Sequence, residues 1–220
     1  MTRGVDSGEA WLIAVTALLV LAISFGSPYI TIVALKRIAA EFGGERSVPS
    51  GASALAWLGT GIGGLLMGLI AERVGVRRTV VFGSFMLASG LALSSLGAQW
   101  QLYLGHGLLI GLLGNGSINA PLYVYVSRWF EARRGTAVAL IAGGQYIAGA
   151  FWPPLFERTI AAWGWRQTML GFAAVVVALV LPLALIMLKP PPASPAAAAG
   201  GRGDTATLAQ GRVLGLQPNL

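Results

Sequence analysis

Six long apolar runs constrain the fold of this chain more than any other feature of its sequence. The runs are Ala10–Leu35, Gly51–Ala71, Thr79–Ala98, Leu102–Val126, Gly135–Leu155 and Arg166–Leu188. Each is close to the ~20 residues that an α-helix needs to cross the hydrocarbon of a bilayer. A bilayer admits only helices or closed barrels, and runs of this length without strict alternation indicate helices. We therefore predict an all-α integral membrane protein whose six transmembrane helices, residues 10–188, form one bundle.

The composition agrees with a membrane protein and excludes several functions. Only 10% of the 220 residues are charged, whereas a soluble domain carries about 25%. The net charge of +7 arises mostly from basic residues in the short gaps between the runs, so we assign it to membrane topology and not to nucleic acid. The absence of cysteine excludes disulfides and thiolate metal sites. We find no metal-ligand cluster, phosphate loop or catalytic triad, and we therefore expect no metal, no cofactor and no enzymatic activity.

The distribution of basic residues predicts the orientation. If the N-terminus is cytoplasmic, ten lysines and arginines fall on the cytoplasmic side and five on the other. Because such residues are enriched in cytoplasmic segments, we predict a multi-pass protein of the cell (inner) membrane with both termini in the cytoplasm. Residues 1–9 then form a cytoplasmic N-terminus. Residues 189–220, rich in Pro, Ala and Gly, are typical of a flexible cytoplasmic linker or truncated tail.

A charged gap, "GLIAERVGVRR", separates the second and third runs. Gly75 supplies backbone freedom for a tight turn, the arginines anchor the topology, and Glu72 is expected to pair with them or to lie at a helix N-terminus. The stretch resembles the cytoplasmic loop motif of the major facilitator superfamily, with Glu72 where that family usually has Asp. The matching residues are Gly68, Arg73, Gly75, Arg77 and Arg78. The resemblance implies that this loop, together with Arg133 and Arg134 of the next cytoplasmic gap, acts as a latch on the cytoplasmic side.

A second stretch, "RWFEARRGTAVALIAGG", lies between the fourth and fifth runs. It is similar to the monocarboxylate-transporter-like branch of that superfamily, which carries an aromatic-Phe pair, two basic residues and spaced small residues ending in Gly. The matching residues are Trp129, Phe130, Arg133, Arg134, Ala137, Ala139 and Gly144. The other motif of the branch is only faintly echoed by "DSGEAW" at the start of the first run. The resemblance implies alternating-access transport of a small organic anion such as a monocarboxylate.

The resemblance covers only half of the family's fold. Members typically have twelve helices in two bundles, and this chain resembles the N-terminal six-helix half. Its expected partners are a small-molecule substrate, the lipid bilayer, and either a missing C-terminal six-helix half or a second copy of the chain. Two alternatives stay open beside the transporter: a truncated fragment that does not transport, and a half-size carrier that acts as a homodimer.

Polar side chains inside the runs are the candidates for a substrate cavity, because such residues in hydrocarbon are costly and often functional. Four-residue spacing places several of them on shared helix faces. The candidates are Asn115, Asn119 and Tyr123 in the fourth run, Gln145 and Trp152 in the fifth, and Tyr29 in the first. The alternative is plain hydrogen bonding between helices. The fourth run lacks the central arginine that many superfamily members carry, so a charge that binds an anion would come from the missing half.

Two further patterns concern helix packing. Glycines recur at four-residue spacing as Gly59/Gly63, Gly64/Gly68 and Gly107/Gly111. Small residues at this spacing let helix backbones approach closely, so we expect tight packing, with sliding helices as the alternative. Four aromatic residues, Trp129, Phe130, Trp163 and Trp165, fall at expected water–lipid boundaries, where we expect an aromatic belt.

Overall fold

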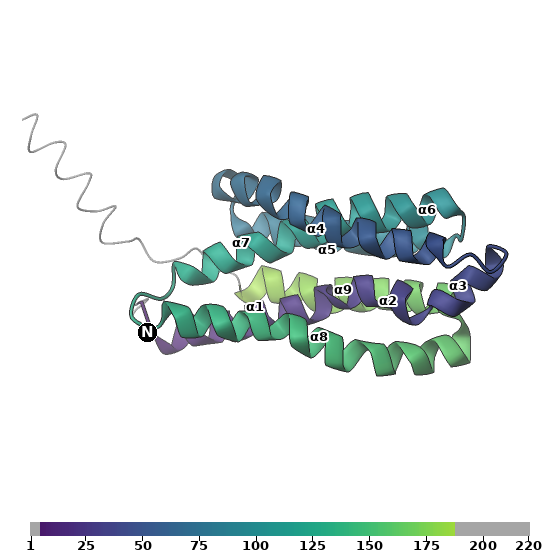
Figure 1. The fold of residues 1–220 in the computed structure, drawn as a ribbon. Coiled ribbons are helices and arrows are strands. Elements are labelled where there is room, and N and C mark those ends of the chain that lie inside the picture. The colour runs from purple at the N-terminus through teal and green to yellow at the C-terminus, as the bar shows by residue number, and fades with distance from the viewer. Residues whose placement is uncertain (1–4, 188–220) are drawn as a thin grey trace, which may run out of the picture.

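The computed structural model describes residues 5–187, which form a bundle of helices that run roughly along one axis (Figure 1). The elements are α1 (Gly8–Ser24), α2 (Gly26–Val33), α3 (Leu35–Glu41), α4 (Ser47–Val74), α5 (Val76–Ser95), α6 (Gln99–Tyr103), η1 (Leu104–Asn115), α7 (Gly116–Ser127), α8 (Arg134–Trp163) and α9 (Trp165–Met187). Segment η1 is a π-helix, the wide helical form with i→i+5 hydrogen bonds. The part of the chain that the structure describes contains no strand, and the predicted all-α fold is confirmed.

Five stretches of the described chain are long and apolar enough to cross a membrane. They are Gly8–Val33, Ser47–Val74, Val76–Ser95, Gln99–Ser127 and Trp165–Leu185, and they overlap five of the six predicted runs. The remaining run, Gly135–Leu155, lies within α8, whose 30 residues extend over about 45 Å, more than the ~30 Å of hydrocarbon. Glycines, prolines and Gln145 make α8 less apolar than the others. It nevertheless runs along α1 and α2 from one end of the bundle to the other (Figure 1).

The first of these stretches is broken near its middle. Helix α1 ends at Ser24, and α2 begins at Gly26 after a single intervening residue. Pro28 explains the break, because its nitrogen has no hydrogen to donate to the carbonyl of Ser24. The backbone at Gly26 lies so close to α8 that an added Cβ would be 2.9 Å from Cδ1 of Trp152. The break therefore places the backbone of Gly26, which has no side chain, in contact with the indole ring of Trp152.

The helices form two layers in Figure 1. Helices α4 and α5 and the continuous rod α6–η1–α7 make one layer, and α1, α2, α8 and α9 make the other. Segment η1 packs on both α4 and α5, while α8 packs on α1 and α2. Helix α5 also packs on α9 and so joins the layers. The core contains fully buried apolar side chains from both layers, among them Val20, Leu21, Leu87, Ile118, Ile141 and Val176.

The two ends of the bundle carry different numbers of basic residues. The α4–α5 turn and the α7–α8 loop lie at one end, and α3 and the α8–α9 turn lie at the other (Figure 1). The first end, called the arginine-rich end below, holds Arg73, Arg77, Arg78, Arg128, Arg133 and Arg134. The opposite end holds Lys36, Arg37, Arg46, Arg158 and Arg166. The two groups that the sequence assigned to different sides of the membrane are thus at different ends of the described bundle.

The predicted aromatic belt is wrong for three of its four residues. Trp129 and Phe130 are 0% exposed, because residues at the start of the chain pack on them: the Trp11 ring contacts Phe130 and the Asp6 N–H donates to the carbonyl of Trp129. Trp165 is also buried, and its Nε1 donates to Oε1 of Glu41 at 2.8 Å. Trp163, by contrast, is 65% exposed, so the belt stays a prediction for this residue.

Candidate functional site

A single glycine makes the turn between α4 and α5 at the arginine-rich end. Gly75 is the only residue between Val74 and Val76, the ends of the two helices. Its φ of +93° lies in the region that glycine adopts without the steric cost of a Cβ. Its N–H donates to the carbonyl of Ala71 at 2.9 Å and closes the end of α4. The predicted tight turn at Gly75 is confirmed.

Glu72 has a partner that its own loop does not supply. Nη2 of Arg128, at the end of α7, lies 3.5 Å from Oε1 of Glu72. Both side chains are about half exposed. The two residues also line one small pocket between α4 and α7, together with Gly68 and Pro121. The charged motif after the second run is therefore joined to the second motif through Arg128, a residue that we did not include in the predicted latch.

The other arginines of the predicted latch have different roles. Nε of Arg134 donates to the carbonyls of Ser127 at 3.1 Å and Phe130 at 3.3 Å, so this side chain closes the end of α7. Within the described chain, Arg73, Arg77, Arg78 and Arg133 form no ion pair. Their charges face water at the arginine-rich end and are available to groups outside this bundle.

Asp6 holds the loop between α7 and α8 in place. Its carboxylate accepts the backbone N–H groups of Glu131, Ala132 and Arg133 at 3.3, 3.0 and 3.3 Å. Its own N–H donates to the carbonyl of Trp129 at 3.1 Å. The N–H of Ala132, followed by those of its neighbours, holds the pKa of the Asp6 carboxyl below its usual value, although partial desolvation acts in the opposite direction. The sequence "DSGEAW" was the only signal for this contact, and by itself it did not identify a partner for Asp6.

An aromatic contact accompanies the Asp6 contact. The rings of Trp11 and Phe130 meet edge to face, with centroids 5.0 Å apart. Tyr125 and Trp129 meet in the same way at 6.2 Å. The structure therefore places "DSGEAW", at the start of α1, in contact with the "RWFEARR" stretch that leads into α8.

Two of the predicted cavity residues meet across neighbouring helices. Nε2 of Gln145 on α8 donates to Oδ1 of Asn119 on α7 at 3.2 Å. Both side chains are partly exposed, so each amide keeps hydrogen-bonding capacity for a further partner. Tyr123, four residues after Asn119, is also partly exposed. These residues form a polar strip, defined here as Asn119, Tyr123 and Gln145, in an otherwise apolar part of the bundle.

Asn115 lies at the junction of η1 and α7 and is almost fully buried, with 1% of its surface exposed. Neither its amide oxygen nor its amide nitrogen has a hydrogen-bond partner within the described chain. A buried amide without partners is costly, so Asn115 stays a candidate for the predicted substrate cavity.

Tyr29 and Trp152 surround the break between α1 and α2. Nε1 of Trp152 donates to the carbonyl of Ala22 at 2.6 Å, so the indole N–H is already used. Tyr29 lies beside Gly149 of α8, where an added Cβ would be 2.9 Å from the phenol oxygen. Its ring centroid is 6.4 Å from that of Trp57. Of these two aromatic candidates, Tyr29 is the one whose polar atom makes no described hydrogen bond.

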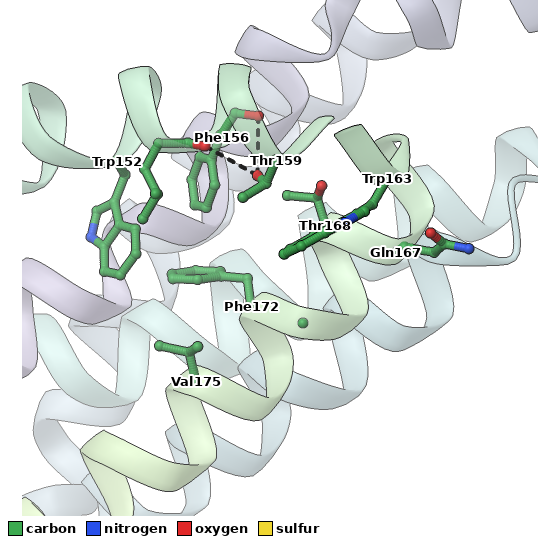
Figure 2. Close-up of a pocket in the computed structure, with 10 residues that line it drawn as sticks. Trp152, Phe156, Thr159, Trp163, Gln167, Thr168, Phe172 and Val175 are labelled. Carbon is green, nitrogen blue, oxygen red and sulfur yellow. Dashed lines mark hydrogen bonds between the residues drawn. The ribbon is translucent and has the colours of Figure 1, made fainter. Parts of the chain in front are cut away.

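A pocket of about 200 Å³ lies between α8 and α9 (Figure 2). Trp152 is the only one of the six predicted cavity residues among those that line it. This pocket is therefore distinct from the polar strip. Within the described chain, no group of His, Asp and Glu side chains has the arrangement of a metal site.

Comparison with known proteins identifies the family. The model of the Major Facilitator Superfamily matches residues 17–219. MFS-type transporter pynF of Aspergillus niger is 28% identical over 193 residues, which are 84% of this chain and 43% of that protein. Monocarboxylate transporter 11 of Mus musculus is 32% identical over 189 residues, 82% of this chain and 42% of that protein. Monocarboxylate transporter 14 of Homo sapiens is 30% identical over 172 residues, 78% of this chain and 34% of that protein.

These relatives are named as transporters and not as enzymes, which agrees with the function class that the sequence predicted. The chain spans less than half the length of the relatives described above. The family match extends over most of the chain, the described helices are long and apolar, and the two loop motifs meet at the arginine-rich end. The chain is a multi-pass membrane protein that belongs to the major facilitator superfamily.

Proposed function

We propose that this chain is one six-helix half of a transporter that moves a small organic anion, such as a monocarboxylate, by alternating access. The observation that carries the proposal is the Gln145–Asn119 hydrogen bond of 3.2 Å between α8 and α7. Polar groups inside a transmembrane bundle are costly and mark solute pathways. Relatives named as monocarboxylate transporters support this substrate class.

The polar strip offers hydrogen bonds but no charge. Neither Gln99–Ser127 nor Gly135–Phe156 contains an Asp, Glu, Lys or Arg residue. A carboxylate bound there would be held by neutral hydrogen-bonding groups with no cation beside it. Such an unpaired charge is unfavourable in a medium of low dielectric constant. We therefore infer that the cation that balances the solute is contributed by a second bundle, either a C-terminal six-helix half or a second copy of the chain.

The same proposal assigns an orientation and a place. The arginine-rich end faces the cytoplasm because lysine and arginine are enriched in cytoplasmic segments. The membrane is the cell (inner) membrane, with both termini inside. The Glu72–Arg128 pair and the unpaired arginines near it then act as a latch that closes the cytoplasmic side against the second bundle and opens during transport.

Uptake into proteoliposomes tests the transport proposal. If two copies of the 220-residue chain form the carrier, the chain alone is expected to take up radiolabelled lactate or pyruvate with saturable kinetics. Asn119→Leu and Gln145→Leu are then each expected to reduce uptake. Gln99→Leu is the matched control, because Gln99 bonds only to Tyr103 in an exposed pair. Uptake no faster than in empty liposomes would refute the homodimer and favour either the inert fragment or a carrier that needs a C-terminal six-helix half. Saturable uptake of a neutral or cationic solute, with none of either anion, would refute the substrate class.

The latch gives a second test in the same assay. Glu72→Ala is expected to slow uptake, while the free energy of unfolding changes by no more than about 1 kcal/mol, because the pair is exposed. Glu72→Arg combined with Arg128→Glu is expected to recover part of the rate, since it restores the pair with reversed charges. Glu131→Ala is the control on the same end of the bundle. Normal flux in Glu72→Ala would contradict the latch.

A further inference from the structure

The pocket between α8 and α9 is a groove at the surface of the bundle. Its lining comes from the second half of α8 and the first half of α9, as Figure 2 shows. The residues that line it are Trp152, Leu155, Phe156, Thr159 and Trp163 on α8, and Gln167, Thr168, Gly171, Phe172 and Val175 on α9. No other segment of the described chain contributes to the lining.

The lining offers hydrocarbon and aromatic surface but hardly any hydrogen bonds. The hydroxyl of Thr159 donates within α8, to the carbonyls of Leu155 at 3.1 Å or Phe156 at 3.2 Å. The hydroxyl of Thr168 donates to the carbonyl of Gly164 at 2.8 Å. Both hydroxyl groups are therefore engaged by their own helices. A polar solute would lose its hydrogen bonds to water on entering this groove, so an apolar occupant is favoured.

One end of the groove is polar and lies at the end of the bundle. Trp163 and Gln167 lie at this end, whereas Trp152 and Val175 lie at the other (Figure 2). Tryptophan at a helix end is typical of the boundary between lipid and water. Helix α9 is strongly apolar beyond this point, with a mean hydropathy of 2.5 over its best window. The groove therefore runs from the membrane surface into the hydrocarbon.

Positive charge is in slight excess around the polar end. Three arginines and two glutamates lie on the helices that meet near this end: Arg37 and Glu41 on α3, Glu157 and Arg158 on α8, and Arg166 on α9. Arg166 is paired with Glu41 at 2.6 Å, and Arg37 donates to the carbonyl of Ile160. Arg158 is exposed and forms no ion pair within the described chain. Its guanidinium suits the phosphate of a lipid headgroup.

We propose that this groove binds one acyl chain of a membrane phospholipid, with the headgroup phosphate near Gln167 and Arg158. An amphipathic lipid matches the groove in both respects, because the apolar part lies in the hydrocarbon and the polar part lies at the membrane surface. The volume of about 200 Å³ is smaller than that of a usual ligand pocket of roughly 300–1,000 Å³. It therefore takes part of one chain and not a whole lipid.

Gly171 provides a variant that fills the groove without disturbing the fold. An added Cβ at Gly171 meets no atom within 4 Å, and the residue lines the groove. Leucine is a better helix former than glycine, so Gly171→Leu is expected to fold normally. Gly61→Leu is the matched control, because Gly61 on α4 also has open space around an added Cβ and lies outside the groove.

Photolabelling tests the proposal with the full chain in phosphatidylglycerol vesicles that contain a trace of phosphatidylglycerol bearing a diazirine in mid-chain. Mass spectrometry is expected to find labels on α8 and α9 at Phe156, Phe172 and Val175. Gly171→Leu is expected to reduce these labels roughly tenfold, the effect of displacing about two buried methylene groups. Gly61→Leu is expected to leave them unchanged.

Two results would overturn the proposal. Labels at these positions that persist in Gly171→Leu at the level of Gly61→Leu would mean that the lipid only passes along the surface. Labelling by a diazirine fatty acid, without labelling by the phospholipid, would identify a free acid as the occupant. Arg158→Gln separately tests the headgroup contact. If Arg158 binds the phosphate, this variant is expected to be labelled more weakly by phosphatidylglycerol.

Discussion

Asp6 uses both carboxylate oxygens to hold the α7–α8 loop, with Oδ2 bound to the N–H groups of Glu131 and Ala132 and Oδ1 bound to that of Arg133. These three N–H groups precede α8 and have no carbonyl partner one turn earlier in the helix. The short Asp6 side chain accepts hydrogen bonds from these N–H groups. Ordering it costs less conformational entropy than ordering a longer side chain would. The contact joins the start of α1 to the loop that leads into α8.

Asp6→Asn is expected to loosen this loop. The amide keeps one acceptor oxygen but replaces the other with a donor, so at least one of the three loop N–H groups loses its partner. Hydrogen exchange at residues 131–133 should accelerate relative to wild type. Glu131→Gln, which removes a neighbouring charge and leaves Asp6 intact, is the control. Equal exchange rates in the two variants would argue against the role of Asp6.

The same contact predicts a pH dependence. Because the pKa of Asp6 is lower in the folded chain than its usual 3.8, the protection is fully present above that value. It is lost only as the pH falls through the lower folded value. Exchange corrected for its intrinsic pH dependence should therefore change in wild type at a pH below 3.8, and should show no such step in Asp6→Asn.

At the scale of the element, glycines decide how closely α4 approaches η1. A Cβ on Gly63 would collide with the carbonyl oxygen of Leu112, and one on Gly59 with that of Gly107. Gly68 has no atom within 4 Å of such a Cβ, although it has the same four-residue spacing. The predicted close approach is therefore confirmed for Gly59 and Gly63 and not for Gly68. The obstacle at the first two positions is backbone, which cannot rotate away as a side chain can.

Gly63→Ala is expected to destabilise the bundle by about 1–3 kcal/mol, the usual cost of an extra methyl group in a well-packed contact. Gly61→Ala, two residues away on the open side of α4, is expected to be neutral or to stabilise by up to about 1 kcal/mol, because alanine favours helix. Unfolding in mixed micelles measures both. A loss of stability in Gly61→Ala as large as in Gly63→Ala would show that the close approach is not the cause.

At the scale of the whole molecule, the helices place the basic residues of the described chain in two groups at opposite ends of the bundle (Figure 1). The arginine-rich end also holds both loop motifs and the Glu72–Arg128 pair. A cluster of this kind is stable only where water or lipid phosphate solvates it. The bundle is therefore charged at both ends and apolar in its middle.

Single cysteines test the proposed orientation directly, because the chain contains none. Glu131→Cys at the arginine-rich end is expected to react with a membrane-impermeant maleimide in inverted vesicles but not in intact cells. Glu45→Cys at the opposite end is expected to show the reverse pattern. Both positions are exposed, so a lack of reaction reports the membrane and not burial. Labelling of Glu131→Cys in intact cells would reverse the assignment of the two sides.

The sequence by itself determined the all-α membrane fold, the positions of the long apolar segments, the glycine turn at Gly75 and the family. Those features depend on short stretches, because hydrocarbon forces each backbone segment to satisfy its own hydrogen bonds. Only the tertiary structure decided which side chains meet. Glu72 and Arg128 are 56 positions apart, and Asp6 and Ala132 are 126 apart. Such pairs arise from the way the helices pack, and no periodicity within one helix encodes them.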